Sequence, residues 1–120
     1  MATTATTTAP LLKQGDAYKF PVTLYLNGEK MTGSILPLLE VIEFTLGNLE
    51  PVPLDPTEIY SETLEAFLFP VTQEQTFALE EGRTEMDIRV QFLGGDVLGI
   101  RQKIKLKVMD ATSEEVLDYA

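Results

Sequence analysis

Apolar and polar residues alternate along two neighbouring stretches of the chain, residues 84–93 and 97–108. This period of two predicts a pair of β-strands, each with one face in a core and one face in water. Residues 94–96, Gly-Gly-Asp, separate the stretches and favour a hairpin turn, so we expect the strands to pair antiparallel. Gln102 is an exception, because it is a polar residue at an inward position. The other inward positions are Met86, Ile88, Val90, Phe92, Ile100, Ile104, Leu106 and Val108.

The same alternation appears in two earlier segments, residues 17–26 and 39–46, and residues 62–69 form a further predicted strand with apolar residues on both faces. Asn27 and Gly28 follow the first of these segments and are the strongest short hairpin signal in the chain. A short return strand is therefore expected within residues 29–38. Three prolines fall within residues 51–56 and predict an extended surface connection.

Thr72 and Gln75 fit a helix capping box, which predicts one short helical turn near residues 72–76, ended near Gly82. About six to eight short strands with turn signals between them predict an all-β fold, an immunoglobulin-like antiparallel β-sandwich. A closed or half-closed β-barrel is the alternative architecture. The Cys-Trp-Cys pattern of immunoglobulin domains is absent, since the chain contains neither residue type.

The chain is expected to form one domain with an extension at each end. Residues 1–12 are rich in threonine and alanine and are predicted to be a flexible N-terminal arm. Residues 13–109 contain the predicted strands and are expected to form the sandwich. Residues 110–120 contain few apolar residues and are predicted to be a C-terminal tail. No apolar run approaches the ~20 residues of a membrane-spanning helix, and no secretory signal is expected.

Composition excludes several kinds of chemistry. The chain contains no cysteine and no histidine, so it cannot build a Cys/His zinc site, a Cys-His pair or a Ser-His-Asp triad. We expect a protein that is not an enzyme and that binds neither a cofactor nor a metal. Asp55 and Glu58 could offer two oxygen ligands to a cation, but a solvated turn is favoured because the dense acidic loop of a calcium site is absent. The net charge of −10 argues against binding nucleic acid through a general basic surface.

The outward face of the last predicted strand is basic. It carries four residues, Arg101, Lys103, Lys105 and Lys107. We expect this row to lie across from acidic residues of the adjacent strand, such as Glu85 and Asp87, because opposite charges stabilise cross-strand pairs. The alternative is that the row, as the basic surface of an acidic chain, contacts an acidic neighbour in an assembly.

Two apolar pairs are further candidates for contacts. Phe67 and Phe69 lie in a segment with apolar residues on both predicted faces. This pattern favours a strand buried between two layers, and contact with another subunit is the alternative. Val116 and Leu117 are the apolar residues through which the C-terminal tail could dock.

Three stretches of the sequence resemble one known group of proteins. They are Gly15-Asp16 before an alternating strand, the phrase 71–76 (Val-Thr-Gln-Glu-Gln-Thr) leading into Ile88-Arg89-Val90, and the ending 113–117 (Ser-Glu-Glu-Val-Leu). These stretches resemble small structural proteins of the tail or virion modules of Gram-positive phages and prophages. They are also similar to the immunoglobulin-like N-terminal domain of siphophage upper baseplate proteins.

The resemblance covers the second half of the chain well and the first half only in pattern. The chain departs from the group in having Gln75 where a second glutamate is usual, a long Thr/Ala arm, and the proline-rich insert at 51–56.

The resemblance implies a non-enzymatic virion structural or assembly protein, in a tail, baseplate or capsid-associated position. Its partners would be other virion proteins or further copies of itself, with no nucleic acid and no membrane, and it would be assembled into the virion in the bacterial host cytoplasm. The alternative function is a ligand- or glycan-binding sandwich of the adhesin type.

Overall fold

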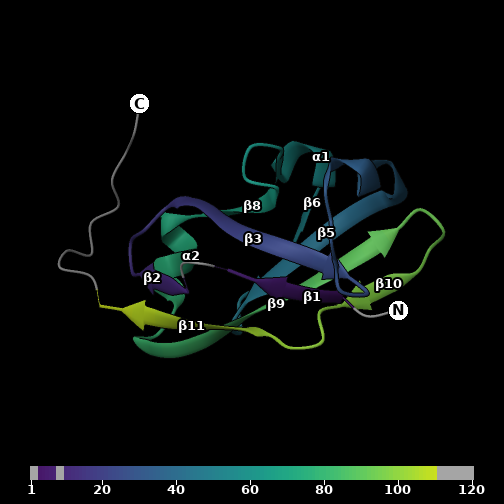
Figure 1. Cartoon of the computed structure of the whole chain (residues 1–120). Helices are drawn as coiled ribbons and strands as arrows, with labels where there is room; N and C mark the ends of the chain where they lie inside the picture. Colours follow the sequence, from purple (N-terminus) through teal and green to yellow (C-terminus); the bar gives the residue numbers. More distant parts are fainter. Residues whose placement is uncertain (1–2, 8–9, 111–120) are drawn as a thin grey trace.

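The computed structural model describes residues 3–7 and 10–110, which form two β-sheets packed as a sandwich (Figure 1). The first sheet has the strand order β1 (Thr3–Thr6), β3 (Tyr18–Leu26), β8 (Ala66–Val71) and β7 (Tyr60–Ser61), with β4 (Glu29–Lys30) also paired to β3. The second sheet has the order β2 (Leu11–Lys13), β11 (Ile104–Met109), β9 (Gly82–Phe92), β5 (Leu39–Leu46) and β6 (Val52–Leu54), with β10 (Val97–Gly99) also paired to β9.

The strand order is that of an immunoglobulin-like sandwich. In such a fold one sheet has the order A-B-E-D and the other contains C, F and G, with C′ added beside C in the variable type. We letter the strands in the order in which they occur along the chain. The first sheet, β1-β3-β8-β7, then has the order A-B-E-D, and the second sheet, β11-β9-β5-β6, has the order G-F-C-C′. The predicted all-β sandwich is therefore confirmed. The strands form two sheets, which meet at one edge through an isolated bridge between Thr3 and Ile100 and do not close into a barrel.

The core lies between the two sheets and is built from the inward residues of the alternating segments. Seven of the eight positions predicted for the hairpin are buried, and Phe92 at the edge is partly buried against the core. Phe44 of β5 and Phe69 of β8 join the sheets, with ring centroids 5.3 Å apart. Tilted aromatic contacts of this kind add to the stabilisation from buried apolar area.

The predicted hairpin is present, but its second strand is interrupted. Gly99 pairs with Arg89 and Ile104 pairs with Met86, so four residues, 100–103, face only two residues of β9. Because two extra residues preserve the alternation, Ile100 and Ile104 are both buried. Gln102 is exposed in the resulting bulge, which explains a polar residue at an apparently inward position.

The N-terminal residues differ from the expected flexible arm. β1 pairs antiparallel with β3 over four residues, from Thr3 opposite Leu26 to Thr6 opposite Thr23. β2 crosses to the second sheet and pairs parallel with β11, and its Leu12 is fully buried in the core. Backbone hydrogen bonding to a strand edge needs no large side chain, so a segment of threonine and alanine can form an edge strand.

The connections between strands agree with several local signals. The capping box of α2 (Gln73–Ala78) is confirmed, because the Thr72 hydroxyl accepts from the Gln75 amide and the Gln75 side chain accepts from the Thr72 amide. The expected return strand after Asn27 is only the two residues of β4, and a 3₁₀ helix, η1 (Gly33–Leu38), follows it.

The proline-rich segment contains the short edge strand β6 and then α1 (Pro56–Ile59). The Asp55 carboxylate accepts hydrogen bonds from both the amide and the hydroxyl of Thr57, at 3.0 and 2.8 Å. This carboxylate therefore caps α1.

The contact between Phe44 and Phe69 predicts a large effect of truncation. Phe44→Ala should lower the free energy of unfolding by about 3–5 kcal/mol, because it removes a fully buried ring and leaves a cavity. Leu64→Ala is the control, since Leu64 is 59% exposed and its loss should change stability by no more than about 0.5 kcal/mol. Urea unfolding of both variants measures the difference, and equal effects would contradict this description of the core.

Candidate functional site

The interior of the described region offers little polar chemistry. Its buried polar residues are Thr3 and Thr76, and none of its Asp and Glu residues form a group of three or more that could hold a metal ion. The Thr76 hydroxyl donates to the Asp16 carbonyl and accepts from the Gly15 amide, both at 2.9 Å, and so ties α2 to the turn before β3. Functional groups must therefore be sought on the outer surface.

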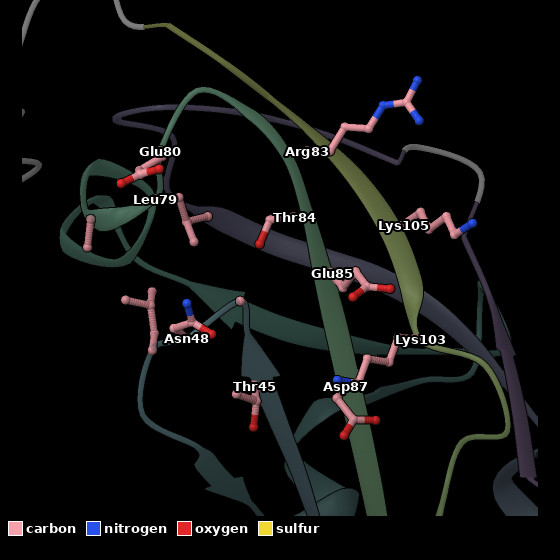
Figure 2. Close-up of a pocket in the computed structure, with 13 residues that line it drawn as sticks. Thr45, Asn48, Leu79, Glu80, Arg83, Thr84, Glu85, Asp87, Lys103 and Lys105 are labelled. Carbon is pink, nitrogen blue, oxygen red and sulfur yellow. The ribbon is translucent and has the colours of Figure 1, made fainter.

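A groove of about 690 Å³ lies where the outer face of the second sheet meets the end of the sandwich. Figure 2 shows its two sides, with Glu85 and Asp87 on β9, Lys105 on β11 and Lys103 just before it, and with Leu79, Glu80 and Asn48 on the surrounding loops. We call it the charged groove. Three cationic and three anionic side chains line it, and no aromatic residue does.

Strand register explains which charges meet on this face. Lys105 lies directly opposite Glu85, as predicted for the basic row, but Lys107 lies opposite Arg83, a residue of like charge. Within residues 3–7 and 10–110, the ion pairs shorter than 4 Å are Lys30–Glu65 and Arg89–Glu43. The four residues of the basic row are exposed and make neither of these pairs.

The parallel pairing of β2 with β11 widens the basic surface. It places Leu11 beside Lys107 and Lys13 beside Met109, and since Leu12 points inward both β2 neighbours lie on the outer face. Leu11 and Met109 are 45% and 42% exposed. We define the basic face as Leu11, Lys13, Arg83, Lys103, Lys105, Lys107 and Met109, which together contain five of the nine Lys and Arg residues of the chain.

The sequence pattern identifies Lys103, Lys105 and Lys107 of this face but not its other four residues. The sequence pattern places Leu11 in the expected N-terminal arm and Lys13 directly after it, and Arg83 lies just before the predicted strand that begins at Thr84. The position of Leu11 and Lys13 depends on a parallel contact between the start and the end of the described chain. Local periodicity gives no signal for such a contact.

The opposite end of the outer face is apolar. Leu38, Leu93 and Val97 are 58%, 62% and 50% exposed. The Leu93 amide donates to the Leu38 carbonyl at 3.0 Å, so these two residues are neighbours, and Val97 lies on the next strand. We call these three residues the apolar end. Arg89 and Glu43 form their 2.7 Å ion pair between the apolar end and the charged groove.

The remaining predicted contact residues have different positions. Phe67 and Phe69 are fully buried in the core, because β8 is covered by the second sheet, so neither ring is available to another chain. Arg101 is exposed in the bulge, and its amide donates to the Thr3 carbonyl at 2.8 Å. Val116 and Leu117 lie outside the described residues.

One tyrosine near the basic face has a perturbed pKa. Burial raises the pKa of the Tyr18 phenol above its ordinary value of 10.0, and the negative charge of Asp16 raises it further. The hydroxyl donates a hydrogen bond to the Leu11 carbonyl at 3.2 Å. This bond links the start of β3 to β2, so Tyr18 has a structural role beside the face.

The chain matches no protein-family model, no curated protein and no solved structure. In the part of the chain that the structure describes, no helix is long and apolar enough to cross a membrane. The assignment of function therefore depends on the surface of this chain and on its sequence motifs.

Gly47 shapes the edge of the charged groove and provides a sharp test of its geometry. A Cβ at this position would lie 2.6 Å from the Thr84 hydroxyl oxygen, whereas a Cβ at Gly28 would meet nothing within 4 Å. Both glycines have a positive φ, 53° and 83°, so alanine strains the backbone at both sites. Gly47→Ala should cost about 1–3 kcal/mol more than Gly28→Ala, because only the first is also crowded. Chemical denaturation compares them, and equal costs would contradict the close approach of Thr84.

The raised pKa of Tyr18 predicts a loss of stability in alkali. The folded chain holds the phenol proton more tightly than the unfolded chain does. The resulting stabilisation is complete below pH 10 and is lost as the pH rises through the folded-state pKa. Urea unfolding from pH 8 to 11 should show a steeper decline for the wild type than for Tyr18→Phe. Parallel pH profiles would show that the phenol is not perturbed.

Proposed function

We propose that the chain is a non-enzymatic structural or assembly protein of a phage virion, in a tail, baseplate or capsid-associated position. It acts through contacts with other protein chains. The observation that carries this proposal is the outer face of the second sheet, which combines the basic face at one end with the apolar end at the other. Both ends lie on one rigid surface, because β9 is paired along both of its edges.

A protein partner that covers this face would bury its exposed apolar side chains and pair its charges. Burying exposed apolar surface is favourable by about 25 cal/mol per Å², and Leu38, Leu93 and Val97 are each at least half exposed. The cations of the basic face lie on a chain of net charge −10, so acidic groups of a partner are their natural complement. Apolar anchors surrounded by charged and polar groups are typical of protein interfaces.

The virion context is supported by the sequence motifs. The phrase at 71–76 coincides with the capping box of α2, and Ile88-Arg89-Val90 lies in β9 at the centre of the second sheet. A sandwich without buried catalytic groups in its described part suits a particle component that assembles with copies of itself or with neighbouring proteins.

The charged groove favours a second candidate, a ligand- or glycan-binding module. Its volume of about 690 Å³ is within the usual range of small-molecule sites, about 300–1,000 Å³. Its lining, however, contains no aromatic ring on which a sugar could stack. Contacts between proteins are therefore the better-supported function.

Co-purification tests the virion assignment. The tagged full-length chain, expressed together with the proteins encoded beside its gene, should co-purify with at least one virion structural protein. Leu93→Asp should weaken this association at least ten-fold, because it places a charge in the apolar end. Leu64→Asp is the matched control, since Leu64 is equally exposed but lies at the turn between β7 and β8.

Two results would contradict this proposal. Neighbouring genes without virion proteins, together with binding on a glycan array, would replace this function by the second candidate. Equal losses from the Leu93 and Leu64 variants would mean that the apolar end is not the contact.

A further inference from the structure

Part of the basic face has an unfavourable arrangement of charges. Arg83 and Lys107 lie directly opposite one another, and like charges in such a pair are destabilising. Glu85 is opposite Lys105, but the distance between their charged groups exceeds that of an ion pair. A negative partner placed along β11 would relieve this repulsion. The exposed side chains of Leu11 and Met109 would give the same partner apolar contacts.

The chain itself contains a segment with the complementary chemistry. Residues 113–119 read Ser-Glu-Glu-Val-Leu-Asp-Tyr, with three carboxylates and three large apolar side chains. No lysine or arginine occurs after Lys107. Glutamates would match the lysines of β11, and Val116 and Leu117 would match Leu11 and Met109.

The strong negative charge of the whole chain does not prevent such a contact. At 0.15 M ionic strength the screening length is about 8 Å, so charges further apart than this interact weakly. Local charges therefore decide whether a segment binds. The basic face contributes five positive charges, whereas three carboxylates, Glu80, Glu85 and Asp87, line the adjoining charged groove.

We infer that the basic face binds the acidic C-terminal segment, residues 110–120, of a second copy of the chain. This inference rests on the proposed function, since it names the partner of the same face. The ten residues after Asp110 reach at most about 36 Å when fully extended, so the segment can extend well beyond the end of β11. Each copy supplies one face and one segment, so reciprocal exchange gives a closed dimer, and a repeated head-to-tail contact gives a longer assembly.

Charge exchange between full-length chains tests the inference. The face variant is Lys105→Glu/Lys107→Glu, and the segment variant is Glu114→Lys/Glu115→Lys. Lys19→Glu/Lys30→Glu is the control, because it changes the net charge as the face variant does but alters exposed residues of the first sheet. Circular dichroism establishes that each variant is folded. Sedimentation equilibrium at 0.15 M salt measures self-association.

The wild type and the control should self-associate with similar dissociation constants. The face variant and the segment variant should each associate at least ten-fold more weakly, because like charges then meet. An equimolar mixture of these two variants should restore a complex, since the lysines of one segment meet the glutamates of the other chain's face. Restoration on mixing is possible only if the contact is between copies.

Three results would overturn the inference. A wild type that stays monomeric up to millimolar concentration would remove it. So would a face variant that associates as tightly as the control. If the mixture fails to associate, and a synthetic 110–120 peptide binds only a chain shortened after Asp110, the segment occupies the face of its own chain instead.

The outcome of this self-association experiment can be distinguished from the outcome of the co-purification experiment that tests the virion assignment. A monomeric wild type that still co-purifies with virion proteins refutes the segment exchange alone. Exchange without any virion partner refutes the virion assignment alone.

Discussion

The structure depends on β9, because this strand is hydrogen-bonded along both edges, to β5 on one side and to β10 and β11 on the other. Its inward residues Met86, Ile88 and Val90 are completely buried. Successive side chains of a strand point to opposite faces, so burying every second residue places the residues between them on the outer face. A shift of the pairing register by one residue would exchange the two faces. The core therefore determines which charges reach the outer face.

The bulge at residues 100–103 shows how strongly this constraint acts. Two extra residues leave the alternation unchanged, so Ile104, Leu106 and Val108 remain buried while Lys105 and Lys107 remain outside. An insertion of one residue would have turned the lysines inward at a large cost in desolvation. The same bulge contacts β1, since the Arg101 amide donates to the Thr3 carbonyl. In this way the first strand and the last hairpin stabilise one another.

Much of the fold could be predicted from the sequence, because burial of alternate residues leaves a direct pattern. Strand β5 has the predicted bounds, and the capping box at Thr72 is a local signal that needs no distant partner. The position of β1 could not be predicted in this way, since its pairing uses backbone groups and its side chains are small. Thr3 is buried, and its hydroxyl has no hydrogen-bond partner among the described residues. No local sequence pattern predicts this burial.

The candidate site was predicted only in part, for a related reason. The lysines of β11 are visible as an outward row, but Lys13 and Leu11 join them through a parallel pairing that spans nearly the whole described chain. Phe67 and Phe69 were ambiguous in sequence, because a strand with apolar residues on both faces can be covered by a sheet of its own chain or by another subunit. The second sheet covers them here.

Zero-length carbodiimide cross-linking tests most directly the claim that the basic face is a contact between copies. An equimolar mixture of ¹⁴N- and ¹⁵N-labelled full-length chains would be cross-linked, digested and analysed by mass spectrometry. If the basic face binds the segment of a second copy, peptides of mixed isotope content should appear in which Lys105 or Lys107 is joined to Glu114 or Glu115. Links confined to peptides of a single isotope, or the absence of any link from these lysines to the C-terminal segment, would contradict it.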